Sequence, residues 1–117
     1  MKCLLLYLPL LLLPFFAPAQ KVISIKIDGT INPASAAFIK KAIDRAAAQN
    51  AVCLVIHLNT PGGLLKSTRI IVGDILESPV PVVVYVSPPG AHAGSAGVFI
   101  TMAAHIAAMA PSTNIGA

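Results

Sequence analysis

Residues 88–100 read PPGAHAGSAGVFI and place one serine, Ser95, among very small side chains. A strand-like run, Pro81 to Val86, precedes this stretch, and an apolar segment with helical character, Ser95 to Ala104, begins within it. Small neighbours let a substrate backbone come close, and a serine at a helix start lies among free N–H groups at the positive end of the helix dipole. A nucleophilic serine needs such surroundings. The same position also suits a simple N-cap serine, so Ser95 alone leaves both roles open.

A second glycine-rich turn lies upstream, where residues 59–63 read NTPGG directly after the apolar run Val52 to Leu58. A Gly-Gly pair after a strand is able to turn backbone N–H groups toward a developing oxyanion. Ser95 and the pair Gly62-Gly63 together therefore suggest acyl-transfer chemistry.

Strand-like and helix-like segments alternate along the chain outward from these two turns. Ile23, Ile25 and Ile27 alternate with polar residues, which is typical of a strand with one buried face. Asn32-Pro33 is a helix-start signal. The β-α-β-α-β-α-β order predicts an α/β fold with parallel strands and right-handed crossovers. The expected strands are Val22 to Ile27, Ala51 to Leu58, Pro81 to Val86 and Ile106 to Met109; the expected helices run from Pro33 to about Gln49, from Leu64 to Leu76 and from Ser95 to Ala104. The Pro/Gly-rich segment from Ser87 to Gly94 is expected to be a loop.

The apolar residues also predict which faces are buried. The run Ala51 to Leu58 shows little alternation, which favours a strand covered on both sides. Phe38 is expected on the inner face of the first helix. The inner stripe expected for the second helix comprises Leu64, Leu65, Thr68, Ile71, Val72, Ile75 and Leu76.

Composition limits the class of protein. The 117 residues suffice for one small domain, and a hydrophobic fraction of 56% is too high for a disordered chain. The net charge of +4 is scattered without a basic run, so nucleic-acid binding has no support. Cys53 is expected to be a buried, unpaired thiol. No two histidines have ligand spacing on one element, so we expect no metal site. Acyl transfer by a serine needs no cofactor, so we expect none.

The N-terminus has the pattern of a secretory signal peptide. Lys2 is a positive start, Leu4 to Phe16 is an apolar core, and Ala17-Pro18-Ala19 fits a cleavage site. We therefore expect residues 1–19 to be a signal peptide and residues 20–117 to be the domain. A retained membrane anchor is the alternative, although the apolar stretch is short and broken by proline.

Three segments resemble one known family. Asn59-Thr60-Pro61-Gly62-Gly63 resembles the Gly-Gly loop of ClpP-class serine proteases, Gly94-Ser95-Ala96-Gly97 their nucleophile segment, and Asn114-Ile115-Gly116-Ala117 the segment that follows. The closest likeness is to the NfeD-like membrane-associated serine proteases, and the opening residues 22–33 also look like the first strand and helix entry of that group. The resemblance implies a ClpP/crotonase-like spiral of β-α units, here an N-terminal fragment that stops before the domain is complete.

The resemblance also implies site residues. Ser95 is the expected nucleophile, and Gly62, Gly63 and the backbone N–H of Ala96 are the expected oxyanion donors. The family activates its serine with a lysine that lies downstream, past Ala117, so half of the dyad is missing from this chain. Lys66, just after the glycine loop, is the one lysine close enough in sequence to replace it. His92 is a second alternative base, which the matched family does not use.

These observations favour an exported serine endopeptidase that acts at the extracytoplasmic face of the membrane. The resemblance implies hydrophobic, membrane-proximal polypeptide substrates, stomatin-like proteins as partners, and a membrane-anchored homo-oligomer in full-length form. An enoyl-CoA hydratase-like enzyme is the first alternative, and the signal segment argues against it because acyl-CoA is cytoplasmic. The second alternative is an inactive, truncated copy that serves as an interaction module.

Overall fold

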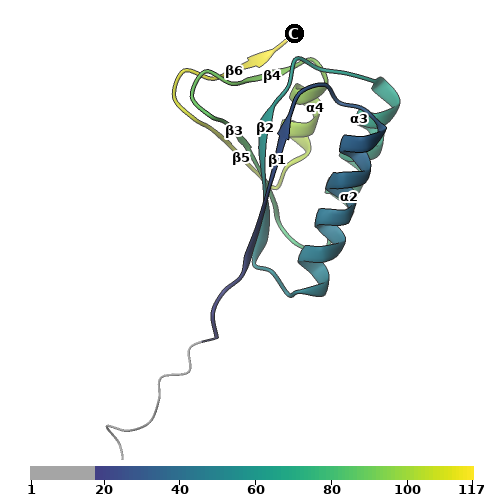
Figure 1. Ribbon diagram of the computed structural model, residues 1–117, viewed down its shortest axis with the longest axis vertical. Coiled ribbons are helices and arrows are strands. Elements are labelled where there is room, and N and C mark those ends of the chain that lie inside the picture. Colours follow the sequence, from purple (N-terminus) through teal and green to yellow (C-terminus); the bar gives the residue numbers. More distant parts are fainter. Residues whose placement is uncertain (1–17) are drawn as a thin grey trace, which may run out of the picture.

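The computed structural model describes residues 18–117 (Figure 1). Residues 1–17, which carry nearly all of the expected signal peptide, lie outside the described residues. None of the helices within residues 18–117 combines the length and the hydropathy that a membrane crossing requires.

A parallel four-stranded sheet forms the centre of the fold, in the order β1-β2-β3-β5. The strands are β1 (Val22–Asp28), β2 (Cys53–Asn59), β3 (Val82–Val86) and β5 (Ile106–Met109). All four expected strands are present, each within two residues of its predicted bounds. Sequential parallel order with a helix in each crossover is the arrangement that the alternating pattern predicted.

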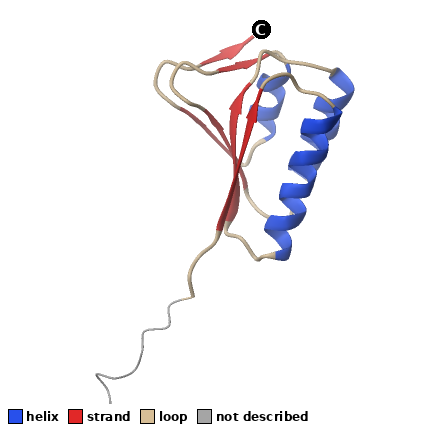
Figure 2. Cartoon of the chain, in the orientation of Figure 1, coloured by secondary structure: helices blue, strands red, loops and turns tan. Residues whose placement is uncertain are grey.

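The helices α2 (Pro33–Ala48), α3 (Leu65–Leu76) and α4 (Ala96–Ala103) all lie on one face of this sheet (Figures 1 and 2). The expectation that β2 is covered on both sides is therefore wrong. Leu54, Ile56 and Leu58 are fully buried under the helices, whereas the residues between them are only half-buried. Cys53, the first residue of β2, is half-buried and not buried as expected, and its thiol has no disulfide partner within residues 18–117.

Helix α2 begins as the sequence predicted. The Asn32 side chain accepts a hydrogen bond from the Ser35 N–H at 3.0 Å, and the Ser35 hydroxyl accepts one from the Asn32 N–H at 2.9 Å. This reciprocal capping box, with Pro33 in the first helical position, satisfies N–H groups that an isolated helix start leaves without partners.

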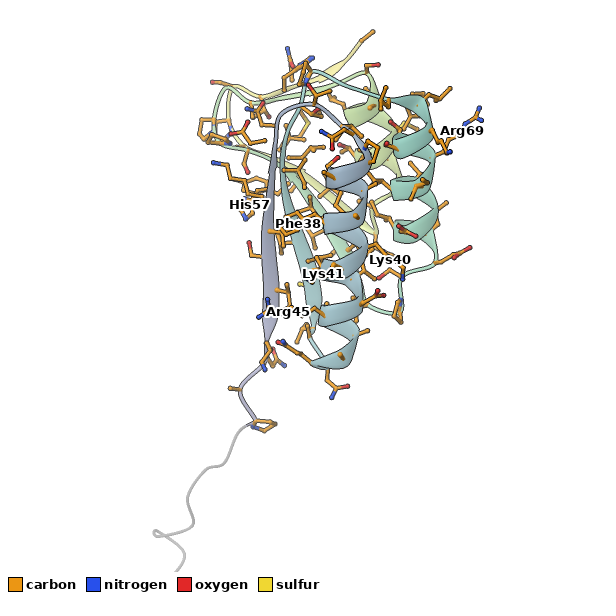
Figure 3. The ribbon with its side chains drawn as sticks, turned by 45° about the vertical axis from the view of Figure 1, so that its right-hand side comes forward. Phe38, Lys40, Lys41, Arg45, His57 and Arg69 are labelled. Atoms are coloured by element: carbon orange, nitrogen blue, oxygen red, sulfur yellow. The ribbon has the colours of Figure 1, made fainter. Side chains whose placement is uncertain are left out.

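Two predictions about helix faces were wrong. Phe38 is 46% exposed and lies with Lys41 and Arg45 on one side of α2, beside β1 (Figure 3). In α3 the buried residues are Ser67, Thr68, Ile71 and Ile75, while Leu65 and Leu76 are well exposed. Leu64, the N-cap residue of α3, is exposed as well. Within residues 18–117 the helix packs against α2 and α4, and its apolar stripe is wider than the surface that these residues offer to cover it.

A second, two-stranded sheet was missed by the sequence analysis. It pairs β4 (His92–Gly94) with β6 (Asn114–Gly116) in parallel, above the carboxyl ends of the main strands (Figure 1). The segment 87–94 had been expected to be a loop throughout. Strands of three residues in a Pro/Gly-rich segment carry too few side chains to show a period of two.

Candidate active site

The candidate site lies where the chain leaves β2 and approaches β4. The Thr60 N–H donates to the His92 carbonyl at 2.7 Å, and the Gly94 N–H donates to the Thr60 carbonyl at 2.9 Å. These two bonds hold the Gly62-Gly63 loop next to the strand that leads into Ser95. The site is thus at the carboxyl edge of a parallel sheet, where open α/β folds commonly bind ligands.

Ser95 occupies a sharp turn between β4 and α4. It is exposed, and its backbone has φ +48° and ψ −104°, a region that residues other than glycine rarely adopt. Its side chain does not cap α4, so the simple N-cap role is excluded in this structure. Strain of this kind costs about 1–3 kcal/mol and is concentrated at functional sites. The Ser95 N–H donates to the Gly116 carbonyl at 2.9 Å, which supports the turn from β6.

Gly62 lies directly against Ser95. A Cβ atom on Gly62 would stand 2.9 Å from the Ser95 Cβ and 3.4 Å from its Oγ, and Gly62 has φ +127°. Any larger residue at this position would collide with the serine side chain and strain the backbone. The two turns that the sequence singled out are therefore brought into contact.

Gly63 continues the loop along the end of β1. The Ile31 N–H donates to the Gly62 carbonyl at 2.8 Å, and the Leu64 N–H donates to the Ile31 carbonyl at 2.9 Å. In such a parallel bridge the N–H and C=O of the middle residue, Gly63, point away from Ile31. A Cβ atom on Gly63 would stand only 2.6 Å from the Ile31 nitrogen, so this position also requires glycine.

The three expected oxyanion donors differ in what they already bind. The Gly62 N–H donates to the Thr60 hydroxyl at 3.1 Å. The Gly63 N–H has no hydrogen-bond partner within residues 18–117. Ala96 is the first residue of α4, so its N–H has no acceptor inside the helix. Gly63 and Ala96 are accordingly the two with an N–H available for a ligand.

Neither alternative base makes a hydrogen bond to Ser95 within residues 18–117. Lys66 is exposed and lines a hollow between α2 and α3 together with Lys40 and Asp74. The His92 ring lies against Gly94, but its Nδ1 pairs with the Asn114 Oδ1. Within residues 18–117, the Ser95 hydroxyl has no hydrogen-bond partner at all.

Side chains at the strand ends connect the two sheets. The Asn59 Nδ2 donates to the Asp28 Oδ1 at 3.2 Å, while the Asn59 Oδ1 accepts from the His92 N–H at 3.0 Å. With the His92–Asn114 pair, this chain of contacts runs from β1 to β6. It fixes the position of β4 and, through β4, the position of Ser95.

The other two histidines have structural contacts. Figure 3 shows His57 on the side of the sheet away from α2; its Nδ1 lies 2.9 Å from the Ser87 hydroxyl, and its ring packs edge-on against Tyr85. The His105 Nδ1 accepts the Val82 N–H at 3.0 Å, a role at the start of β3 that its position after a helix did not suggest. The part of the chain that the structure describes holds no cluster of three or more His, Cys, Asp or Glu residues.

An apolar groove runs between α3 and α4 and has a volume of about 570 Å³. Two of its lining residues are near the glycine-rich turns in the sequence: Leu65 follows Gly63 by two residues, and Phe99 follows Ser95 by four. Leu65, Phe99 and Met102 are each at least 60% exposed along it.

Comparison with known sequences decides the family. The sequence model described as "NfeD1b, N-terminal domain" matches residues 21–117. The chain belongs to this NfeD1b family. The membrane protein NfeD1b of Bacillus subtilis is 34% identical over 101 residues, which are 86% of this chain and 22% of that protein. The membrane-bound protease PH1510 of Pyrococcus horikoshii is 50% identical over 68 residues, which are 58% of this chain and 15% of that protein.

Solved structures related to this NfeD1b-family chain share its fold. The 1510-N membrane-bound stomatin-specific protease, in a lysine-to-alanine mutant bound to a substrate peptide, is 40% identical with a TM-score of 0.83, covering 86% of this chain and 46% of that one. ClpP1 from Listeria monocytogenes is 25% identical with a TM-score of 0.63, covering 69% and 46% of the two chains. The fold is therefore ClpP-like, as the sequence predicted. The chain spans about half of these solved chains and less than a quarter of the curated relatives.

Membership of the NfeD1b family favours the protease interpretation over the acyl-CoA alternative, because the named relatives include membrane-bound proteases of ClpP-like fold. Two residues of the site were not singled out from the sequence. These are Asn59 and Thr60, which lie between the apolar run Val52 to Leu58 and the Gly-Gly pair. Their position directly after the apolar run was the signal that the end of the strand carries polar side chains.

Proposed function

We propose that the chain carries the nucleophile and oxyanion loop of a serine endopeptidase, with Ser95 as the nucleophile. One observation carries the proposal: an exposed serine in a strained strand-to-helix turn lies against a Gly-Gly loop with φ +127° and +158°. The same combination of a strained serine turn and nearby backbone donors supports acyl transfer in unrelated hydrolases.

The proposed reaction has two steps. The Ser95 Oγ bonds to a peptide carbonyl carbon while a base takes its proton, and the amine then leaves with that proton. Water next attacks the acyl-enzyme, releases the acid and restores the hydroxyl. The N–H groups of Gly63 and Ala96 bind the oxyanion, and Gly62 supplies the space beside Ser95. Each lost donor costs such an enzyme roughly 10²–10³-fold in rate.

The base of the proposed Ser-Lys dyad is a lysine from outside residues 18–117. Ser95 has no base within hydrogen-bond distance in the described residues, and a general base contributes roughly 10²–10⁴-fold. The 117-residue chain alone is therefore expected to have no significant peptidase activity. Hydrolysis by the purified 117-residue chain that is lost on Lys66→Ala would contradict this and make Lys66 the base.

The proposed substrates are hydrophobic, membrane-proximal polypeptides, with stomatin-like proteins as partners. The apolar groove between α3 and α4 supports this choice, since apolar side chains of a bound polypeptide would lose water against Leu65 and Phe99. A relative of ClpP-like fold is named as a stomatin-specific protease. Comparing cleavage of peptides that differ only in one leucine-to-serine replacement next to the scissile bond measures this preference.

The proposed location is the extracytoplasmic face of the membrane, after cleavage of residues 1–19. The Lys2 start, the apolar core and the Ala17-x-Ala19 pattern support export. N-terminal sequencing of the membrane and secreted fractions is the measurement, and a chain that begins at Gln20 is expected. A cytoplasmic chain that still begins at Met1 would contradict export.

A homo-oligomer is the proposed state of the full-length protein. Its test is the molar mass in detergent by light scattering, where a mass equal to one subunit would contradict the proposal.

Covalent labelling tests the nucleophile directly. A fluorophosphonate is expected to modify Ser95, in the chain extended by the segment that supplies the lysine, and Ser95→Ala is expected to abolish labelling. Ser112 is a matched control, because it is also exposed and has φ +61° but faces no glycine pair. Labelling that survives Ser95→Ala or disappears in Ser112→Ala would contradict the assignment.

A further inference from the structure

We infer that Thr60 is a positioning residue, whose hydroxyl holds the Gly62-Gly63 loop in place beside Ser95. The inference rests on the proposed function for its kinetic consequence, although the contact that it describes is independent of any activity.

The Thr60 side chain is bonded twice to a single residue of the loop. Its hydroxyl donates to the Gly62 carbonyl at 3.1 Å and accepts from the Gly62 N–H at 3.1 Å. The hydroxyl has one proton to donate and lone pairs to accept, so both bonds are made at once. Thr60 is 1% exposed, so its hydroxyl is shielded from bulk solvent, and hydrogen bonds in such surroundings are electrostatically stronger than in water.

Thr60 is itself held by two further elements, β4 and α4. Its backbone pairs with β4 through the His92 carbonyl and the Gly94 N–H, at 2.7 and 2.9 Å. A Cβ atom on Gly97 would stand 2.9 Å from the Thr60 methyl group, so this methyl group packs against the first turn of α4. Loop, nucleophile strand and helix α4 therefore all meet at this one side chain.

This arrangement has a consequence for the donors. Gly62 contacts Ser95, and the next peptide carries the available N–H of Gly63. Movement of Gly62 would shift that N–H relative to Ser95, and a displacement of about 1 Å is enough to cost roughly 10²-fold in rate. An aliphatic side chain of the same shape would fill the space of Thr60 but would leave the Gly62 N–H without its acceptor.

Three variants separate the hydroxyl from the packing, in the chain extended by the segment that supplies the lysine. Thr60→Val keeps the shape and removes the hydroxyl, whereas Thr60→Ser keeps the hydroxyl and removes the methyl group. Thr101→Val is the matched control. Thr101 is also buried, and its hydroxyl donates to a glycine carbonyl, that of Gly97, at 2.7 Å, but it does not touch the loop.

The first measurement is amide hydrogen exchange at Gly62, which needs no catalysis. Protection is expected in the wild type, in Thr60→Ser and in Thr101→Val, and its loss is expected in Thr60→Val. Equal protection of Gly62 in the wild type and in Thr60→Val would overturn the inference, whether or not the chain proves to be a protease.

The second measurement is steady-state cleavage of a hydrophobic peptide. Thr60→Val is expected to lower kcat by about 10²-fold with KM nearly unchanged, and Thr60→Ser is expected to recover most of the rate. Thr101→Val is expected to lower the melting temperature but not kcat. Equal loss of kcat in Thr60→Val and Thr101→Val, or in Thr60→Val and Thr60→Ser, would reduce Thr60 to a packing residue. Failure of the proposed function shows separately, as activity that survives Ser95→Ala.

Discussion

Strand β2 and the loop that follows it are stabilised in different ways. The middle of the strand, with Leu54, Ile56 and Leu58 fully buried, is held by apolar contact under the helices. Just beyond its end, Gly62 and Gly63 adopt backbone conformations that apolar contact does not require. The middle of the sheet tolerates any side chain of suitable size and polarity. The Gly62-Gly63 loop at the edge of the sheet requires glycine, because what must be positioned there is the backbone and not a side chain.

The largest expected effect is at the edge. In the chain extended by the lysine segment, Ser95→Ala is expected to reduce kcat by about 10⁶-fold, the order seen when a hydrolase loses its serine. The Kd of a hydrophobic peptide is expected to stay within a few-fold, because the groove and the glycine loop are untouched. Steady-state assays measure kcat and isothermal titration measures the Kd. A parallel loss of binding would contradict the view that Ser95 acts in the reaction and not in holding the substrate.

The next effect is on the loop. Gly63→Val places a Cβ within 2.6 Å of the Ile31 nitrogen, so both the oxyanion donor and the bridge between Gly63 and Ile31 are disturbed. We expect kcat/KM to fall by roughly 10²–10³-fold or more. Gly73→Ala is the control, since nothing lies within 4 Å of a Cβ there and the glycine is inside α3. This control is expected to stabilise the helix by up to about 1 kcal/mol and to leave the rate unchanged.

The middle of the sheet is expected to behave in the opposite way. Ile56→Ala leaves a cavity at a fully buried position and should cost about 2–5 kcal/mol of unfolding free energy. The fraction that remains folded is expected to keep its kcat. Urea unfolding, with active-site titration to count folded molecules, separates stability from rate; a large loss of kcat per folded molecule would show that the two regions are coupled.

The smallest effect is expected at His92. Its side chain pairs with Asn114, but the bonds from Asn59 and Thr60 to the backbone of β4 remain in His92→Ala, and the side chain has no assigned part in proton transfer. The substitution should therefore change kcat/KM by only a few-fold. The pH profile of kcat is expected to keep its shape. If His92→Ala proved as damaging as Ser95→Ala, a Ser–His mechanism would replace the Ser-Lys dyad.

Sequence alone predicted the middle of the sheet and the two key turns for different reasons. The alternation of Ile23, Ile25 and Ile27 with polar residues follows from the burial of one strand face. The Gly62-Gly63 pair follows from backbone conformations that other residues rarely adopt. The exposure of Phe38 and Leu65 was missed because an apolar side chain indicates a tendency to be buried, but it does not indicate which part of the protein would bury it. The role of Thr60 was missed because its hydrogen bonds run to Gly62 and its backbone partners lie in β4, which had been expected to be a loop.

The bond from the Ser95 N–H to the Gly116 carbonyl also sets an order of assembly. A chain emerging from the ribosome contains Ser95 well before Gly116, so the turn around the serine lacks its β6 acceptor while the nascent chain is still short. Contacts between distant residues form only after the intervening loop has closed. Under the proposed export route, a chain that crosses the membrane unfolded would therefore carry Ser95 in an ordinary, unstrained backbone, and the strained serine turn would form only after translocation.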